Sequence, residues 1–298
     1  MNLALGTRRG PRAPRNVAVL ALLLAVTAAC APQSEEGSSG KEGKADGKGC
    51  ARGSLDTETR GKLTVATDKP AYEPWFKDNK PAGGKGFESA TAYAVAKQLG
   101  YGRSDVVWRT VPFNKAFAPG EKNFDFDINQ VSVSDERRKA VDFSKGYYDV
   151  RQAVVALRKS SAAKAKSVAD LKKAKLGAQV GTTSLDVIND VVRPERPAAA
   201  FAKNDQAKSA LKNGQVDAIV VDLPTAFYIT GAEVTDARIV GQFADRGSEP
   251  EQFGLVLDKG SSLTSCVSKA VDTLRRDGTL AKLEKRWLSD AVDAPVLK

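Results

Sequence analysis

The sequence predicts an α/β protein in which helices cover mainly parallel sheets. Short apolar strands alternate with helical segments from residue 62 onward, a pattern typical of such sheets. After an N-terminal leader, about 250 residues remain, which is enough for one large domain or two lobes. No segment repeats with a period of roughly 20–50 residues, so a repeat architecture is not predicted.

Strands are expected where β-branched and other apolar residues run between turn residues. These runs are 62–67, 106–111, 124–128, 152–157, 176–180, 216–221 and 253–257. Helices are expected over 88–99, 167–173 and 205–212, and one more opens at 181–184. From Leu263 apolar residues recur on one helical face, and a last helix carries Leu280, Leu283 and Trp287.

Polar residues follow several of these strands at the carboxyl end. In open α/β sheets, ligands bind beside the carboxyl ends of the strands, so these residues predict a polar cleft. They are Asp68, Asn129, Gln130, Thr182, Thr183 and Asp222.

Residues 1–29 have the features of a signal peptide. Four arginines precede an uncharged stretch of 13 residues, 17–29, which is too short to span a bilayer as a helix. The stretch ends in Thr27-Ala28-Ala29-Cys30, which resembles the lipobox of bacterial lipoproteins, in which the cysteine is acylated. Cys30 is therefore the predicted lipidation site, and an ordinary secretory signal is the alternative.

Residues 30–60, which include Cys50, are expected to form a flexible tether between the lipid and the folded part. Residues 31–49 hold five Gly and three Ser and have no large apolar residue, so they cannot bury a core. A disordered leader without an anchor is the alternative. The predicted location is the cell membrane, on its extracytoplasmic face.

The counts of cysteine, histidine and charge exclude several kinds of function. If Cys30 is acylated, Cys50 and Cys266 remain for a disulfide bond in an exported protein, and two free thiols are the alternative. The chain has no histidine, which excludes Ser-His and Cys-His catalysis and histidine metal sites, and no cofactor is predicted. Without the leader arginines, 42 basic residues face 36 acidic ones, a spread net charge of +6 that predicts no nucleic-acid site.

A charged motif connects these features to a known family. Ser132 to Arg137, followed by 140–144 and then Tyr147-Tyr148, resembles the amino-acid-binding family of ABC-importer receptors, family 3 of the solute-binding proteins, in its actinobacterial lipoprotein type. Further similar segments cover about residues 62–290 in order. They are 67–76, 86–88, 170–183, 216–222, 252–254 and 277–280.

The resemblance implies a two-lobed fold of the type II periplasmic-binding-protein class. Residues 61–150 and 250–298 would form lobe 1, and residues 151–249 would form lobe 2. Two hinge crossings, near 150–152 and 248–253, would join the lobes. The ligand would close the cleft, and the monomeric receptor would then dock on an ABC permease in the membrane.

The resemblance also assigns roles to the residues of the expected cleft. Arg137 would hold the carboxylate of a free amino acid and Asp222 its ammonium. Thr182, Thr183 and Ser132 would add donors, and Gln130 a backbone carbonyl. Tyr72 and Phe113 would enclose the ligand side chain, and Trp75 and Asn129 are further candidates for ligand binding. Asp68 favours a polar or cationic amino acid.

Other interpretations of these residues and of the function remain open. In isolation, the charge run at 135–138 is typical of a solvated surface, Asp222 or Thr183 of a helix N-cap, and Tyr72 or Phe113 of a core. No enzyme activity is expected. The alternatives are a dehydratase or murein lyase on the same fold, with Glu88 as general acid or base, and a ligand-binding sensor lipoprotein.

Overall fold

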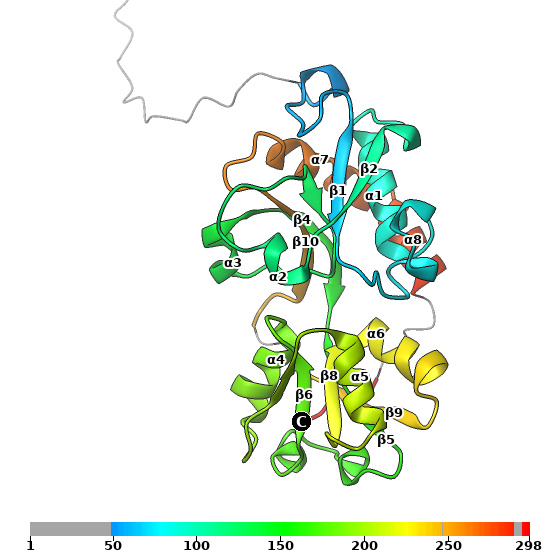
Figure 1. Cartoon of the computed structure of the whole chain (residues 1–298), viewed down its shortest axis with the longest axis vertical. Coiled ribbons are helices and arrows are strands. Elements are labelled where there is room, and N and C mark those ends of the chain that lie inside the picture. Colours follow the sequence, from blue (N-terminus) through cyan, green and yellow to red (C-terminus); the bar gives the residue numbers. More distant parts are fainter. Residues whose placement is uncertain (1–48, 246, 289–293) are drawn as a thin grey trace, which may run out of the picture. The chain divides into compact units, whose positions relative to one another are not determined.

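The computed structural model describes residues 49–288, except 246, and residues 294–298. These residues form two lobes, each built on one five-stranded sheet (Figure 1). The predicted signal peptide and Cys30 lie outside the described residues. The first sheet has the order β2(Val106–Thr110), β1(Leu63–Thr67), β3(Phe126–Asp127), β10(Glu251–Leu257), β4(Asp142–Val150). The second has the order β7(Ala199–Phe201), β6(Leu176–Gln179), β8(Ala218–Asp222), β5(Gln152–Leu157), β9(Ala237–Gln242).

Both sheets are mixed, which corrects the expectation of mainly parallel sheets. In each sheet two strand pairs are parallel and two are antiparallel. The antiparallel pairs in each sheet include the strand that enters the lobe from a chain crossing, β10 or β5. Such a strand runs away from the junction of the lobes, whereas β1, β3, β6 and β8 end there.

The helices form where the apolar residues can face a sheet. The longest are α1(Phe87–Gln98) and α7(Thr264–Arg276), which pack with β1 and β10 around a core that includes Leu63, Phe126 and Val267. The second sheet has a separate core on each face. The remaining α-helices are α2(Phe113–Ala116), α3(Asp135–Ala140), α4(Thr183–Val187), α5(Asn204–Lys212), α6(Leu223–Tyr228) and α8(Thr279–Trp287). In the described part of the chain, no helix is long and apolar enough to span a membrane.

A disulfide bond joins Cys50 to Cys266, as the sequence predicts. It attaches the first described residues to α7 across 216 positions of sequence. Such a link stabilises a fold chiefly by restricting the unfolded chain.

The end of the chain contacts the second lobe, although residues 250–298 were expected in the first. Val296 forms a parallel bridge with Gln242 of β9, and Leu297 is buried in a core of the second sheet. Gln242 also donates through Nε2 to the carbonyl of Ala294 at 2.6 Å. Burial of Leu297 and the hydrogen bonds around Gln242 account for this attachment.

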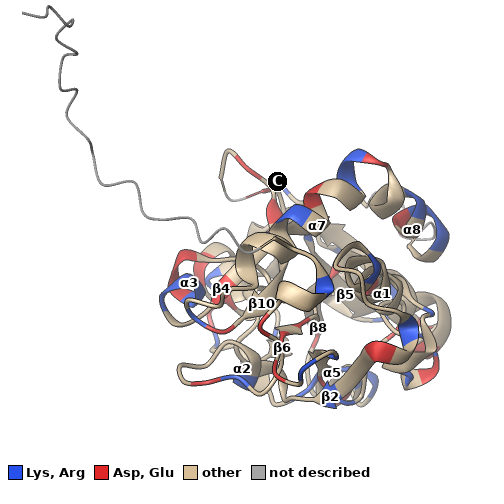
Figure 2. Cartoon of the chain, turned by 90° about the horizontal axis from the view of Figure 1, so that it is seen from above, with Lys and Arg blue, Asp and Glu red and all other residues tan. Residues whose placement is uncertain are grey.

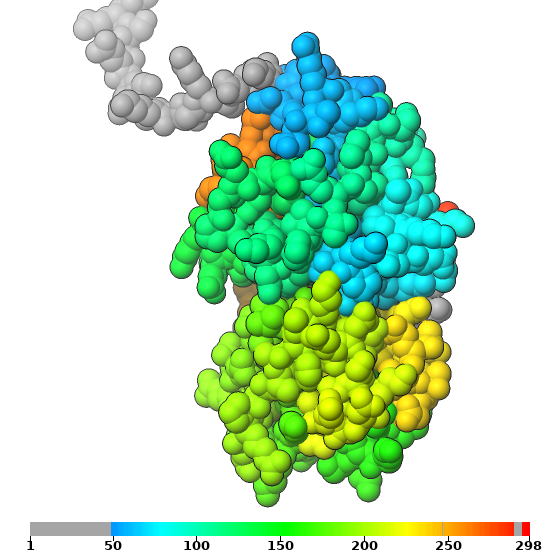
Figure 3. Space-filling model, in the orientation of Figure 1, coloured from blue at the N-terminus to red at the C-terminus, as the bar shows by residue number. Residues whose placement is uncertain are grey.

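The charged residues show no segregation by sign in the view from above. Figure 2 shows basic and acidic residues next to one another on α3, and α7 also carries both. In the space-filling view of Figure 3, the two lobes touch along the face shown.

Candidate functional site

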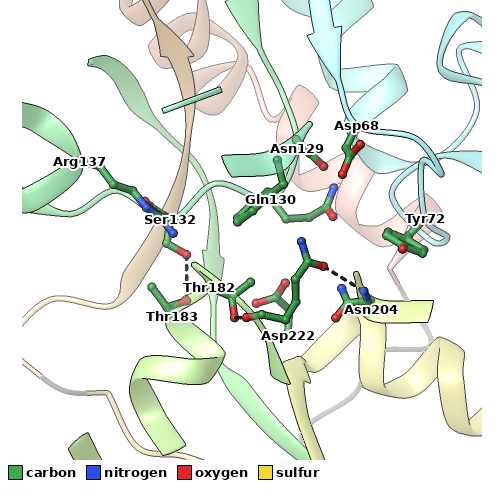
Figure 4. A pocket seen from close by; sticks show the side chains of 12 residues that line it. Asp68, Tyr72, Asn129, Gln130, Ser132, Arg137, Thr182, Thr183, Asn204 and Asp222 are labelled. Carbon is green, nitrogen blue, oxygen red and sulfur yellow. Dashed lines mark hydrogen bonds between the residues drawn. The ribbon is translucent and has the colours of Figure 1, made fainter. Parts of the chain in front are cut away.

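A polar pocket lies between the lobes, at the strand ends where the sequence predicts a cleft. The space inside it that the centre of a water molecule can occupy is only about 30 Å³, so the pocket is small in this structure. Figure 4 shows that the first lobe supplies Asp68, Asn129 and Gln130, and the second Thr182 and Asp222. The full lining is Asp68, Tyr72, Phe113, Asn129, Gln130, Ser132, Arg137, Gln179, Thr182, Thr183, Asn204 and Asp222.

The structure brings together every expected ligand-binding residue except Trp75. Trp75 is fully buried, packs edge-on against Phe87 and Phe253, and donates through Nε1 to Thr225 Oγ1 at 2.9 Å. It therefore links the lobes beside the pocket and does not line it. Gln179 and Asn204 line the pocket but were not expected. Gln179 is the last residue of β6. The expectation that polar residues at the carboxyl ends of strands line the cleft, which identified Asp222, could therefore have identified Gln179 too.

Arg137 is held in the first turn of α3, and the charge run that contains it is not wholly solvated. Ser134 caps this helix by accepting a hydrogen bond from the Arg137 backbone N–H. The guanidinium donates through Nη1 to the Ser132 carbonyl at 2.6 Å and through Nη2 to the Gly181 carbonyl at 2.8 Å. It also lies 4.3 Å from the ring centroid of Phe117. Because a guanidinium carries five N–H donors, others remain for a carboxylate.

Gly181 allows the loop before α4 to approach the first lobe closely. Its φ is +77°, and a Cβ there would lie 2.3 Å from Oδ1 of Asn114. No side chain fits at this position without a shift. The glycine thus keeps its carbonyl within reach of Arg137.

Asp222 ends β8 and precedes α6, but its side chain does not cap that helix. Instead, its Oδ1 accepts a hydrogen bond from Gln152 Nε2 at 3.0 Å. Burial, followed by the charge of Glu251, raises the pKa of the Asp222 carboxyl to about 7. The hydrogen bond from Gln152 and the charge of Arg137 act to lower that pKa. Asp222 is thus available to a cation, and its charge depends on pH near neutrality.

The hydroxyls of Ser132 and Thr183 meet across the two lobes. Their oxygens lie 3.3 Å apart, and both donate to Oε1 of Glu251, at 2.5 and 2.7 Å. A hydroxyl has one proton, so in this arrangement neither is a free donor for a ligand. Thr182, and not Thr183, is the N-cap of α4, since its Oγ1 accepts from the N–H of Leu185. The N–H groups of Leu185 and Asp186 are thus bonded to Thr182, and those of Thr183 and Ser184 are the donors of the first helical turn that can meet a ligand.

We call Ser132, Arg137, Thr183 and Asp222 the anchored end of the pocket, and Asp68, Tyr72 and Asn204 the side-chain end. Figure 4 shows Ser132, Arg137 and Thr183 toward one side of the pocket and the side-chain end toward the other, with Asp222 between them. At the side-chain end, Nζ of Lys203 lies 3.6 Å from Oδ1 of Asp68, and it also donates to the carbonyl of Lys69. Lys203 belongs to the second lobe and Asp68 to the first, so this ion pair crosses the cleft.

Glu88 lies behind the pocket and does not line it. It is fully buried, and it accepts hydrogen bonds from Tyr147 Oη and from the backbone N–H of Gln130, at 2.5 and 2.7 Å. Burial raises the pKa of the Glu88 carboxyl to about 7. A general acid or base must reach the substrate, and this carboxyl is instead engaged in holding Gln130.

Residues 63–290 match the family "Bacterial extracellular solute-binding proteins, family 3". The chain is 28% identical over 230 residues to the L-cystine-binding protein TcyJ of Escherichia coli K12, covering 76% of this chain and 83% of that protein. It is 28% identical over 270 residues to the glutamine-binding protein GlnH of Bacillus subtilis 168, covering 88% and 92%. Among solved structures, an ancestral arginine-binding protein bound to arginine has a TM-score of 0.64 at 31% identity, covering 76% of this chain and 98% of that one.

Proposed function

Because the chain belongs to family 3 of the bacterial extracellular solute-binding proteins, we propose that it captures a free amino acid outside the cytoplasm and delivers it to an ABC importer. The observation that carries this proposal is the placement of Arg137 and Asp222. One cation from the first lobe and one anion from the second line the same small pocket. An amino acid is a zwitterion, so its receptor needs both charges at a fixed separation.

Capture would hold the pocket closed. Arg137 would meet the ligand carboxylate from the first lobe, and Asp222 would meet the ammonium from the second. Because the ligand touches both lobes more fully when they are together, its binding shifts the protein toward the closed form. The hydrogen bond from Trp75 to Thr225 adds a direct contact between the lobes beside the pocket.

The ligand side chain would face Asp68, Tyr72 and Asn204. These groups offer a carboxylate, a phenol and an amide, which suit a polar or cationic amino acid better than an apolar one. Similar proteins are named for cystine, glutamine, arginine and histidine. This range agrees with a polar pocket and does not select one ligand.

The attachment to the membrane is a further part of the proposal. Cleavage after residue 29 and acylation of Cys30 would anchor the protein. The tether would be shorter than the expected 30–60 and would end at Cys50, because the disulfide bond fixes that residue to α7. Lobe 1 would then comprise 61–150 and most of 250–288, lobe 2 would comprise 151–249, and the protein would work as a monomer beside its permease.

An enzyme on the same fold is the second candidate. One structural neighbour, with 30% identity and a TM-score of 0.64, is an ancestral amino-acid-binding protein described as a precursor of cyclohexadienyl dehydratase. The position of Glu88 behind the pocket favours binding over catalysis here. A sensor that signals to a partner would use the same pocket.

A thermal-shift screen of the purified protein against the common amino acids and cystine tests the function. An amino acid at about 100 times its Kd stabilises the folded protein by about 2.7 kcal/mol. We expect a concentration-dependent rise in Tm for a small set of polar or cationic amino acids, without consumption of the ligand. The absence of any rise would reject amino-acid capture, and conversion of the ligand would favour the enzyme.

A further inference from the structure

Each strand that enters a lobe from a chain crossing begins with a polar side chain that contacts the site. Gln152 is the first residue of β5, and Glu251 is the first residue of β10. Neither was singled out from the sequence, and neither lines the pocket. Both instead contact the residues that do.

Gln152 uses both ends of its amide. Nε2 donates to Asp222 Oδ1 at 3.0 Å and lies 3.3 Å from Thr183 Oγ1, while Oε1 accepts from Ser184 Oγ. The residue is only 3% exposed, so these bonds fix its amide in one orientation. The orientation directs an N–H toward the carboxylate of Asp222, which favours the ionised form of that group.

Glu251 gathers three donors on one oxygen. Oε1 accepts from Ser132 at 2.5 Å and Thr183 at 2.7 Å, and Gln152 Nε2 lies 3.4 Å away. Ser132 is in the first lobe and Thr183 is in the second, so this carboxylate bridges them. Its negative charge also lies near Asp222, where it disfavours a second negative charge.

We infer that Gln152 and Glu251 are positioning residues that act on Asp222 in opposite directions. Gln152 holds the Asp222 carboxylate in its anionic form, and Glu251 opposes that form while it aligns the hydroxyls of Ser132 and Thr183. The crossing strands thereby set the pH range in which Asp222 accepts a cation.

Three charged groups and one amide, from four elements, act on the charge of Asp222. Glu251 of β10 and Glu88 of α1 disfavour its ionisation, whereas Arg137 of α3 and the amide of Gln152 on β5 favour it. Gln152 and Glu251 are the two that also hydrogen-bond to Thr183. Substitution of either one therefore changes the balance at Asp222 without removing Arg137.

The consequence for ligand binding rests on the proposed function, in which Asp222 holds the ammonium of an amino acid. Only the carboxylate form attracts that cation. Since burial raises the pKa of Asp222 to about 7 in the ligand-free protein, affinity for the amino acid should increase about tenfold between pH 6 and pH 8.

The test is a carbon-13 NMR titration of the Asp222 carboxyl in the ligand-free protein, with Asp222→Asn to assign the signal. Glu251→Gln keeps an acceptor oxygen and removes the charge, so we expect the titration midpoint to move to lower pH. Gln152→Met keeps the size and removes the donor, so we expect the midpoint to move to higher pH. Glu249→Gln, which removes an exposed charge two residues before Glu251, should leave the midpoint where it is in the wild type.

Calorimetry with the best amino acid from the screen links the titration to binding. At pH 6, Glu251→Gln should bind about three- to tenfold more tightly than the wild type, as a lower pKa of Asp222 requires. Unchanged midpoints in both variants, or a shift in the same direction, would overturn the inference. Opposite shifts without any amino-acid binding would keep the inference and reject the proposed function. If Gln152→Met does not fold, an unmoved midpoint in Glu251→Gln alone rejects it.

Discussion

At the anchored end of the pocket, Arg137, Asp222 and Thr183 are each held by hydrogen bonds from other parts of the chain. At the side-chain end, Asp68 is held across the cleft by one lysine whose side chain is 42% exposed. The first arrangement is a hydrogen-bonded network that reaches both crossing strands, whereas the second depends on one ion pair with a half-exposed lysine. An ion pair with an exposed partner can be exchanged at a small cost in free energy, and a group in a connected network cannot.

This difference separates two questions about the ligand. Under the proposed function, the anchored end would hold the carboxylate and ammonium that every free amino acid shares. The side-chain end would then distinguish one amino acid from another, and its charge depends on a pair that solvent can screen.

The largest effect is expected at the anchored end. Arg137→Ala removes the cation and leaves the ligand carboxylate without its partner. Loss of one member of a buried charged pair costs about 2–5 kcal/mol, so affinity should fall at least roughly thirtyfold for every amino acid that binds. Calorimetry at pH 8 measures this, because Asp222 is then mostly ionised.

Arg138→Ala is the matched control for Arg137→Ala. Arg138 is the next residue on α3 and is exposed, and its guanidinium lies over Phe143, 5.7 Å from the ring centroid. It should bind amino acids like the wild type. An Arg137→Ala protein that folds and binds within threefold of the wild type would show that the carboxylate is held elsewhere.

A second effect, on stability, is expected from Glu88, which lies behind the pocket and accepts a hydrogen bond from Gln130. Its pKa of about 7 exceeds the ordinary value of 4.5, so the folded protein binds a proton that the unfolded chain has released between those pH values. The free energy of unfolding should therefore fall as pH rises from about 4.5 to about 7, by up to about 3 kcal/mol from this group.

Urea unfolding of the ligand-free protein at several pH values tests this assignment. Glu88→Gln should reduce the fall in stability, leaving the share that comes from Asp125, Asp127 and Asp222, whose pKa values burial also raises. Glu121→Gln, at an exposed position, should follow the wild-type curve. Stability that stays level or rises over this range in the wild type would contradict a titrating Glu88.

The sequence predicts the anchored end better than the contacts that support it. Arg137 and Asp222 each lie in a short stretch of sequence that also predicts the neighbouring helix or strand. The resemblance to a family supplies their roles. Glu251 reaches Ser132 across 119 positions, and no local pattern shows where a glutamate after Pro250 will point. Trp75 was expected to bind the ligand, but its large ring instead fills the core.

The strands show the same limit, because local sequence predicts some of them and not others. The apolar run at 152–157 predicts β5 with its observed bounds, because all six residues are buried. The strand β4, at 142–150, was not predicted, since Lys145 and Asp149 are exposed and interrupt its apolar pattern. Its pairing with β10 depends on residues about one hundred positions away, which the local sequence does not contain.

The smallest effect is expected at the side-chain end, where it bears directly on ligand choice. Lys203→Met removes the ammonium that lies 3.6 Å from Asp68 and leaves that carboxylate for the ligand. An ion pair with an exposed partner contributes about 0.2–1 kcal/mol, so the ratio of arginine to glutamine affinity should rise by up to about fivefold. Lys212→Met removes an equal charge from the exposed end of α5, the helix that follows Lys203, and should leave the ratio unchanged. If Lys203→Met weakens both amino acids equally, Lys203 holds the lobes together and does not select the ligand.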